Sequence, residues 1–171
     1  VGRLLFAVAL RPAMQFTVGQ LSRLVSGPTV ADLTYLKRCI RYLSCSKDYV
    51  LRLIPKGPLR VYGFGDSDWA CNAYRKSVSG GFLLLAGACV QSWSRTRASR
   101  ALSSCEAELY SQGSLAVESL WLAGFLEEQG LLKEPPLLHC DSSSAPQLAS
   151  RQGQGRMKHV EVRRLALQGW R

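Results

Sequence analysis

Apolar residues recur at spacings of three and four over the first part of the chain, the pattern of helices that pack on one side. Two short helical patterns occupy residues 1–27 and are separated by Arg11-Pro12, where Pro12 suits the first turn of the second helix. A clearer apolar stripe predicts a helix over about residues 30–45, with Thr29 as its N-cap and Asp32 three positions later. The sequence therefore predicts a helical N-terminal segment.

The pattern then changes to alternation and short apolar runs, which favour strands. Residues 49–54 are predicted to form a short strand, and the PKGP stretch at 55–58 a turn. We place a domain boundary there, between segments 1–56 and 57–171. The stretches 59–69, 80–85 and 88–94 are predicted to contain the strands of a three-stranded antiparallel meander, with Ala86-Gly87 as its second turn. The first of these strands is expected to end just before Asp66, so that Asp66 and Asp68 lie past its end.

A long helix is predicted from Ser103 to Gly130, because glycine commonly ends helices. Glu106 and Glu108 lie in its first turns and are about 200° apart, so they cannot share a face. Glu108 precedes Leu115 by seven residues and is therefore predicted to point toward the packed side. Glu106 is explained by a favourable interaction with the helix dipole.

The last third of the chain is predicted to contain a short strand followed by two helices. The strand, residues 137–140, leads directly to Asp141. Residues 142–149 and 158–167 have helical patterns. Taken alone, Asp141 is equally well explained as an ordinary helix N-cap.

Composition adds two constraints. The chain has 171 residues, 47% of them hydrophobic, which is enough for a buried core, and its net charge of +10 favours a polyanionic partner. A basic protein without such a partner is the alternative. Six cysteines without a zinc-binding spacing indicate buried free thiols and a reducing compartment. Val1 opens an abruptly apolar stretch, so we expect a segment of a longer polypeptide, and no run of about 18 apolar residues predicts a membrane span.

Three acids stand at the edges of predicted elements: Asp66, Glu108 and Asp141. Carboxylates are the ligands that Mg²⁺ and Mn²⁺ prefer. Two such ions about 3.5–4 Å apart can activate a water and stabilise the leaving oxygen in phosphodiester cleavage. Strand-end aspartates are common in proteins of this size, so the spacing alone does not establish such a site.

Several stretches together resemble the ribonuclease H domain of copia-type retrotransposon polyproteins. They are YGFGDSDWA (62–70), RKSVSGG (75–81), SWSRTRASRALSSCEAELY (92–110), LWLAGFLEEQG (120–130), LHCDSSSA (138–145) and RMKHVEVR (156–163). Residues 1–54 resemble the end of the reverse transcriptase that precedes that domain. The resemblance covers nearly the whole chain, in the order of the family.

The resemblance implies a fold, a site and a reaction. The fold would be an α/β, ribonuclease H-like mixed sheet of three antiparallel strands and a parallel fourth, flanked by helices, with the first and fourth strands adjacent. Asp66, Glu108 and Asp141 would hold two Mg²⁺ or Mn²⁺ ions, and the family pattern points to Asp66 rather than Asp68. The reaction would be hydrolysis of the RNA strand of an RNA–DNA hybrid. Candidate phosphate contacts are Arg75, Lys76, Arg156 and Lys158.

The resemblance also implies partners and a place of action. The partners would be the hybrid and the rest of the polyprotein, including its reverse transcriptase, with no membrane involved. We expect an intracellular location, in a cytoplasmic particle or the nucleus. The family continues into a fifth strand and a further metal-binding aspartate, whereas this sequence stops at Arg171 before them.

Two other hypotheses remain. One is a catalytically inactive, nucleic-acid-binding remnant of a polyprotein, suggested by the charge and by the missing last strand. The other is a structural fragment that folds only beside its polymerase half, suggested by the apolar first 25 residues.

Overall fold

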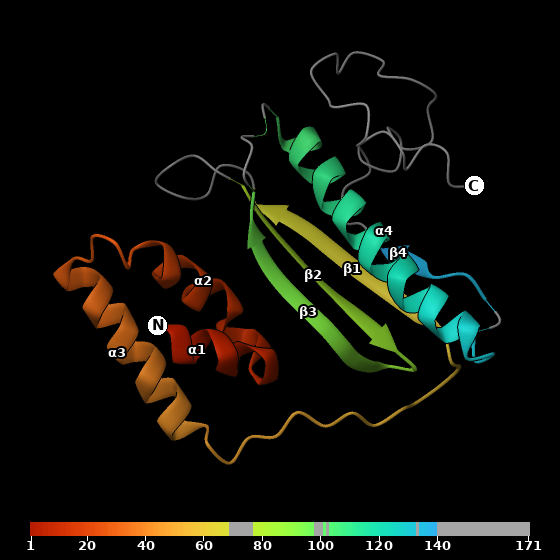
Figure 1. Ribbon diagram of the computed structural model, residues 1–171, viewed down its shortest axis with the longest axis horizontal. Helices are drawn as coiled ribbons and strands as arrows, with labels where there is room; N and C mark the ends of the chain where they lie inside the picture. The colour runs from red at the N-terminus through yellow and green to blue at the C-terminus, as the bar shows by residue number, and fades with distance from the viewer. Residues whose placement is uncertain (69–76, 98–100, 102, 133, 140–171) are drawn as a thin grey trace.

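The computed structural model describes residues 1–68, 77–97, 101, 103–132 and 134–139 (Figure 1). Within these ranges, helices precede a sheet that is covered by one long helix. The N-terminal elements are α1 (Gly2–Ala7), two 3₁₀ turns (Val8–Leu10 and Pro12–Met14), α2 (Gln15–Arg23) and α3 (Val30–Cys45). They are followed by β1 (Val61–Asp68), β2 (Val78–Leu85), β3 (Ala88–Thr96), α4 (Ser104–Glu128) and β4 (Leu137–His139).

The sheet is mixed, with the strand order β3-β2-β1-β4. β1 pairs antiparallel with β2, and β2 with β3, while β4 runs parallel to β1. The predicted meander, its parallel fourth strand and the adjacency of the first and fourth strands are thus confirmed. Ala86 and Gly87 have φ angles of 49° and 80°. Positive φ at both positions of a two-residue loop matches the right-handed twist of the flanking strands, which makes this turn a good hairpin connection.

The predicted end of the first strand was wrong. β1 continues to Asp68, so Asp66 lies inside the strand and pairs with Gly80 of β2. The cause is the partner strand: β2 starts at Val78, opposite Asp68, and so extends the paired region through Asp66 to Asp68.

The predicted strand at residues 49–54 was also wrong, since this stretch has no strand structure. A strand needs a free sheet edge to pair with. On β3, the edge strand nearer to this segment, Gln15 of α2 donates hydrogen bonds to the backbone oxygen and Oγ of Ser92, at 3.1 and 2.9 Å. The N-terminal helices thus occupy part of that edge (Figure 1).

Helix α4 matches the prediction closely. Ser103 is its N-cap and accepts a hydrogen bond from the backbone N–H of Glu106, and Gly130 follows the helix with φ of 68°. The helix packs over β1 and β2. It comes close because β1 has glycine beneath it: a Cβ added to Gly63 would lie 3.0 Å from Cδ1 of Leu115. The glycines of β1 therefore serve helix packing.

Gly81 of β2 is expected to be intolerant of a side chain. A Cβ there would lie 2.3 Å from Cζ2 of the buried Trp93, and a packed indole ring has little freedom to move. We expect Gly81→Ala to lower the free energy of unfolding by about 1–3 kcal/mol. Gly80→Ala is the matched control in urea unfolding, because its Cβ would lie 3.9 Å from the nearest atom outside its chain neighbours, an ordinary contact. An equal loss of unfolding free energy in Gly81→Ala and Gly80→Ala would contradict a clash with Trp93 as the cause.

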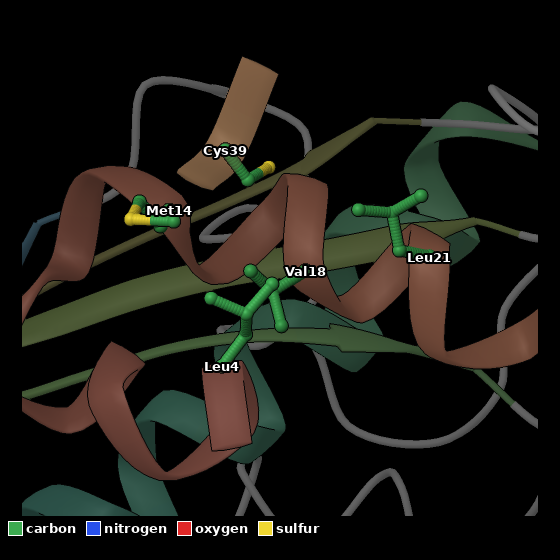
Figure 2. Packing of buried hydrophobic residues seen from close by; sticks show 5 residues of the cluster. All are labelled: Leu4, Met14, Val18, Leu21 and Cys39. Carbon is green, nitrogen blue, oxygen red and sulfur yellow. The ribbon is translucent and has the colours of Figure 1, made fainter. Parts of the chain in front are cut away.

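The N-terminal helices have a small core of their own. Its buried residues are Leu4, Met14, Val18, Leu21 and Cys39 (Figure 2). Thr29 and Asp32 form the capping box that the sequence predicts at the start of α3. Many large apolar side chains of this segment stay exposed, among them Phe6 at 87%.

The cysteines only partly follow the prediction of buried thiols. Cys39 is buried, and burial raises the pKa of its thiol. Cys45 is exposed and Cys89 half-buried. These three form no disulfide. Among the described residues, no helix has the length and apolar character that a membrane crossing needs.

Candidate functional site

Asp66 lies on the open face of the sheet. Along β1, Gly63, Gly65 and Ser67 face α4, and Asp66 alternates with them and is exposed. Its Oδ1 accepts a hydrogen bond of 2.6 Å from the backbone N–H of Ser67, which fixes the orientation of the carboxylate. Asp66 is therefore well placed to meet a ligand from outside.

An open groove of about 390 Å³ lies beside Asp66 on the same face. Aromatic rings from three adjacent strands form one of its walls. Phe64 stacks on Phe82 of β2 and on His139 of β4, with ring centroids 4.8 and 4.6 Å apart. Gly80, opposite Asp66, leaves the groove floor free of a side chain. No local pattern predicts His139 as a groove residue; only the β1–β4 register, in which His139 pairs with Phe64, brings it there.

The second predicted acid, Glu108, is carried by α4 to the same end of β1. Ser111 Oγ donates a hydrogen bond of 2.8 Å to the backbone oxygen of Asp66, and Gln112 Nε2 one of 3.1 Å to that of Gly65. Leu115, one turn later, lies over Gly63 and Gly65, so α4 runs antiparallel to β1. Glu108 lies one turn before Ser111, and hence toward the Asp68 end of the strand.

Glu108 is buried, with 7% of its surface exposed, so the prediction that it points toward the packed side is confirmed. The interpretation of Glu106 as a simple dipole partner was incomplete. Glu106 is 3% exposed, and its Oε1 accepts a hydrogen bond of 2.6 Å from the hydroxyl of Tyr110. Two glutamates on different faces are both buried because this part of α4 is covered on more than one side: Ala101 packs beside Tyr110 in a separate cluster.

A further carboxylate, Glu118, fixes the middle of α4 to β3. It accepts hydrogen bonds from Gln91 Nε2 at 2.7 Å and from Arg95 Nη1 at 2.6 Å. Burial alone raises the pKa of Glu118, but these two hydrogen bonds and the charge of Arg95 outweigh it and hold the pKa below its ordinary value of 4.5. The ionised carboxylate therefore contributes to the attachment of α4.

This shift predicts a pH dependence. A folded-state pKa below the unfolded value gives stability that is present above pH 4.5 and is lost as the pH falls through the folded value. We expect Glu118→Gln to be less stable than the unaltered protein at neutral pH by less than about 1 kcal/mol, because Arg95 is largely exposed. The difference should vanish in strong acid. Urea unfolding at both pH values measures it, and an undiminished difference in acid would contradict the assignment.

The remaining predicted site residues lie outside the described residues. These are Asp141, Arg75, Lys76, Arg156 and Lys158. β4 ends at His139, two positions before Asp141. In the part of the chain that the structure describes, no three histidine, cysteine or carboxylate side chains gather as a metal site. Of the predicted acids, the described residues thus include Asp66, on the open face of β1, and Glu108, on the helix that covers the other face, both near one end of the strand.

These two residues fit a hard divalent cation. Both offer carboxylate oxygens, the donor type that Mg²⁺ and Mn²⁺ favour. Asp66 is open to solvent, so an ion that keeps several waters could approach it, while Glu108 is held on a rigid helix. The chemistry of the donors therefore agrees with the cofactor that the sequence predicts.

The chain is similar to transposon polyproteins over most of its length. It is 31% identical over 165 residues to the retrovirus-related Pol polyprotein from transposon RE1 of Arabidopsis thaliana. The matched stretch covers 95% of this chain and 11% of that protein. It is 32% identical over 166 residues to the retrovirus-related Pol polyprotein from transposon TNT 1-94 of Nicotiana tabacum, covering 95% and 12%. The chain thus spans about a tenth of the length of these relatives.

A shorter relative matches over most of its own length. The chain is 35% identical over 124 residues to secreted RxLR effector protein 161 of Plasmopara viticola, covering 71% of this chain and 87% of that protein. No protein-family model and no solved structure matches. The chain therefore belongs to a family of sequences that includes the Plasmopara viticola protein and the matching region of these transposon Pol polyproteins.

Proposed function

We propose that the chain is a ribonuclease H-type endonuclease of a retrotransposon polyprotein, which hydrolyses the RNA strand of RNA–DNA hybrids. One observation carries the proposal: hydrogen bonds from Ser111 and Gln112 join the acid-bearing turn of α4 to β1 at Asp66 and Gly65. They bring Glu108 and Asp66, 42 positions apart in the sequence, to one end of one strand. The similarity to Pol polyproteins and the mixed four-stranded sheet support it.

Asp141 is the proposed third acid. Phe64 and His139 are the last paired residues of the parallel strands β1 and β4. Asp66 and Asp141 each follow that pair by two positions. Asp141 itself lies outside the described residues, so its role as a ligand is part of the proposal.

Asp66, Glu108 and Asp141 would hold Mg²⁺ or Mn²⁺, and the bound ions would supply the means to activate a water and to stabilise the leaving oxygen. The protein contributes the ligands and their orientation. The Ser67 N–H holds one oxygen of Asp66, and the packing of α4 on the glycines of β1 fixes the helix that carries Glu108. The phosphates of the hybrid would be bound by Arg75, Lys76, Arg156 and Lys158, in keeping with the net charge of +10.

The proposal extends to the organisation of the chain. Residues 57–171 would be the ribonuclease H-like domain, and residues 1–56 the end of a reverse transcriptase. The exposed apolar residues of the N-terminal helices support the second assignment, because such surfaces commonly contact other protein.

Purified protein incubated with Mg²⁺ and a hybrid labelled on each strand tests the function. We expect fragments of the RNA strand, an intact DNA strand, and no cleavage when the metal is chelated. Double-stranded RNA and double-stranded DNA of the same sequence are the matched controls and should stay intact. An RNA strand that survives in the hybrid at every Mg²⁺ concentration would refute the proposal.

A second candidate is an inactive nucleic-acid-binding remnant, which the net charge of +10 favours independently of any catalytic group. It predicts hybrid binding that weakens steeply with salt, because bound phosphates release counterions. Binding measured at several salt concentrations, together with the cleavage assay, separates the two. Tight binding without cleavage would favour the remnant, whereas binding insensitive to salt would exclude it.

A further inference from the structure

A largely buried cluster of polar side chains includes the residues two positions before and after Glu108, outside the proposed ligand set. Tyr110 is at its centre. Its hydroxyl donates the 2.6 Å hydrogen bond to Glu106, and the guanidinium carbon of Arg97 lies 4.9 Å from the centre of its ring. Arg97 in turn donates a hydrogen bond of 2.9 Å from Nε to Ser79 Oγ. Tyr110 thus links the first turns of α4 to β2 and to the residue that follows β3.

Most side chains of the cluster are shielded from water. Glu106, Tyr110 and Ser79 are each at least nine-tenths buried. A hydrogen bond in such a buried place is stronger than in water. Its loss leaves a buried polar group without a hydrogen-bond partner, which costs free energy. The guanidinium over the aromatic face adds a cation–π attraction. The helix turn from Glu106 to Tyr110 is therefore held firmly.

The position of this turn matters for the site. Glu108 lies midway between Glu106 and Tyr110 in the sequence, so fixing both fixes the backbone that carries it. Arg97 follows Thr96, which pairs with Val78, and Val78 pairs with Asp68 of β1. The cluster is thus attached to the sheet at the end where the proposed metal-binding residues lie.

We infer that Tyr110, with Glu106 and Arg97, positions the carboxylate of Glu108 for the metal ion. This inference rests on the proposed function and adds positioning residues to it. A residue that sets the orientation of a metal ligand typically changes metal affinity by about tenfold or more when it is removed. A purely structural residue would lower stability and leave the affinity of the folded protein unchanged.

The test measures Mn²⁺ binding by calorimetry, together with urea unfolding, for Tyr110→Phe. This change removes one hydroxyl and keeps the ring under Arg97. We expect the dissociation constant for Mn²⁺ to rise by about tenfold in the folded variant. Ser114→Ala is the matched control: it also removes one side-chain hydrogen bond of α4, of 3.1 Å to the backbone oxygen of Tyr110, but leaves the contact with Glu106 in place. Its Mn²⁺ affinity should be unchanged.

A double variant shows whether Tyr110 acts through Glu108. In a Glu108→Gln background, Tyr110→Phe should cause no further loss of Mn²⁺ affinity, because the group it positions is gone. The full loss in that background, or unchanged affinity in Tyr110→Phe alone, would overturn the inference. Ser79→Ala, which removes the partner of Arg97, should shift the affinity in the same direction and serves if Tyr110→Phe does not fold. If the unaltered protein binds no Mn²⁺, the proposed function fails first, and the inference fails with it.

Discussion

Replacing Asp66 with asparagine is expected to lower the rate of RNA-strand cleavage at least about a thousandfold, which corresponds to about 4 kcal/mol of transition-state stabilisation. Asparagine has nearly the shape of aspartate and can still accept the hydrogen bond from the Ser67 N–H. It lacks the negative charge that a divalent cation requires. The measurement is single-turnover cleavage of the labelled hybrid in saturating Mg²⁺.

Asp68→Asn is the matched control. Asp68 is also exposed, lies on the same strand and face, and is two residues away. The proposed site does not use it, so the cleavage rate should stay within about threefold of that of the unaltered protein. A loss in Asp68→Asn as large as that in Asp66→Asn would mean that the general negative charge of this end of β1 matters, and not one ligand.

The second large effect concerns stability. Leu115 is fully buried, and its methyl groups lie over the glycines of β1, in a cluster with Leu83 and Trp93. Leu115→Ala should leave a cavity between α4 and the sheet and lower the free energy of unfolding by about 3–5 kcal/mol. That is a large part of the total stability of about 5–15 kcal/mol that a domain of ordinary size has.

Urea unfolding followed by circular dichroism measures this loss. Leu120→Ala on the same helix is the control: Leu120 is 45% exposed, so the same chemical change should cost less than about 1 kcal/mol. Similar losses in the two variants would show that α4 is not packed on β1 through Leu115.

Local signals predicted most of the elements of this fold. The meander follows from alternation and from the turn at Ala86-Gly87, where glycine adopts a positive φ angle without steric cost. Ser103 and Gly130 bound α4 because capping depends on residues close by in the sequence. The inward face of Glu108 follows from helix geometry alone.

Long-range packing decided what the sequence could not predict. β1 extends through Asp66 to Asp68 because β2 pairs with it that far. Residues 49–54 form no strand, and helix α2 meets the β3 edge of the sheet at Ser92. Glu106 is buried through its contact with Tyr110 and the packing of Ala101. The partners of β1 and of the β3 edge are distant in the sequence, whereas Tyr110 lies one helical turn from Glu106, at the i, i+4 spacing that brings side chains together on a helix.

Asp66 and Glu108 are proposed to act together in one catalytic site. The most direct test measures the rates of RNA-strand cleavage in Mg²⁺ for Asp66→Asn, Glu108→Gln and the double variant, each compared with the unaltered protein. Two ligands of one site act as a unit, so we predict that each single variant loses nearly as much activity as the double variant. Losses that multiply in the double variant, or single variants that cleave the hybrid at the unaltered rate, would contradict the claim.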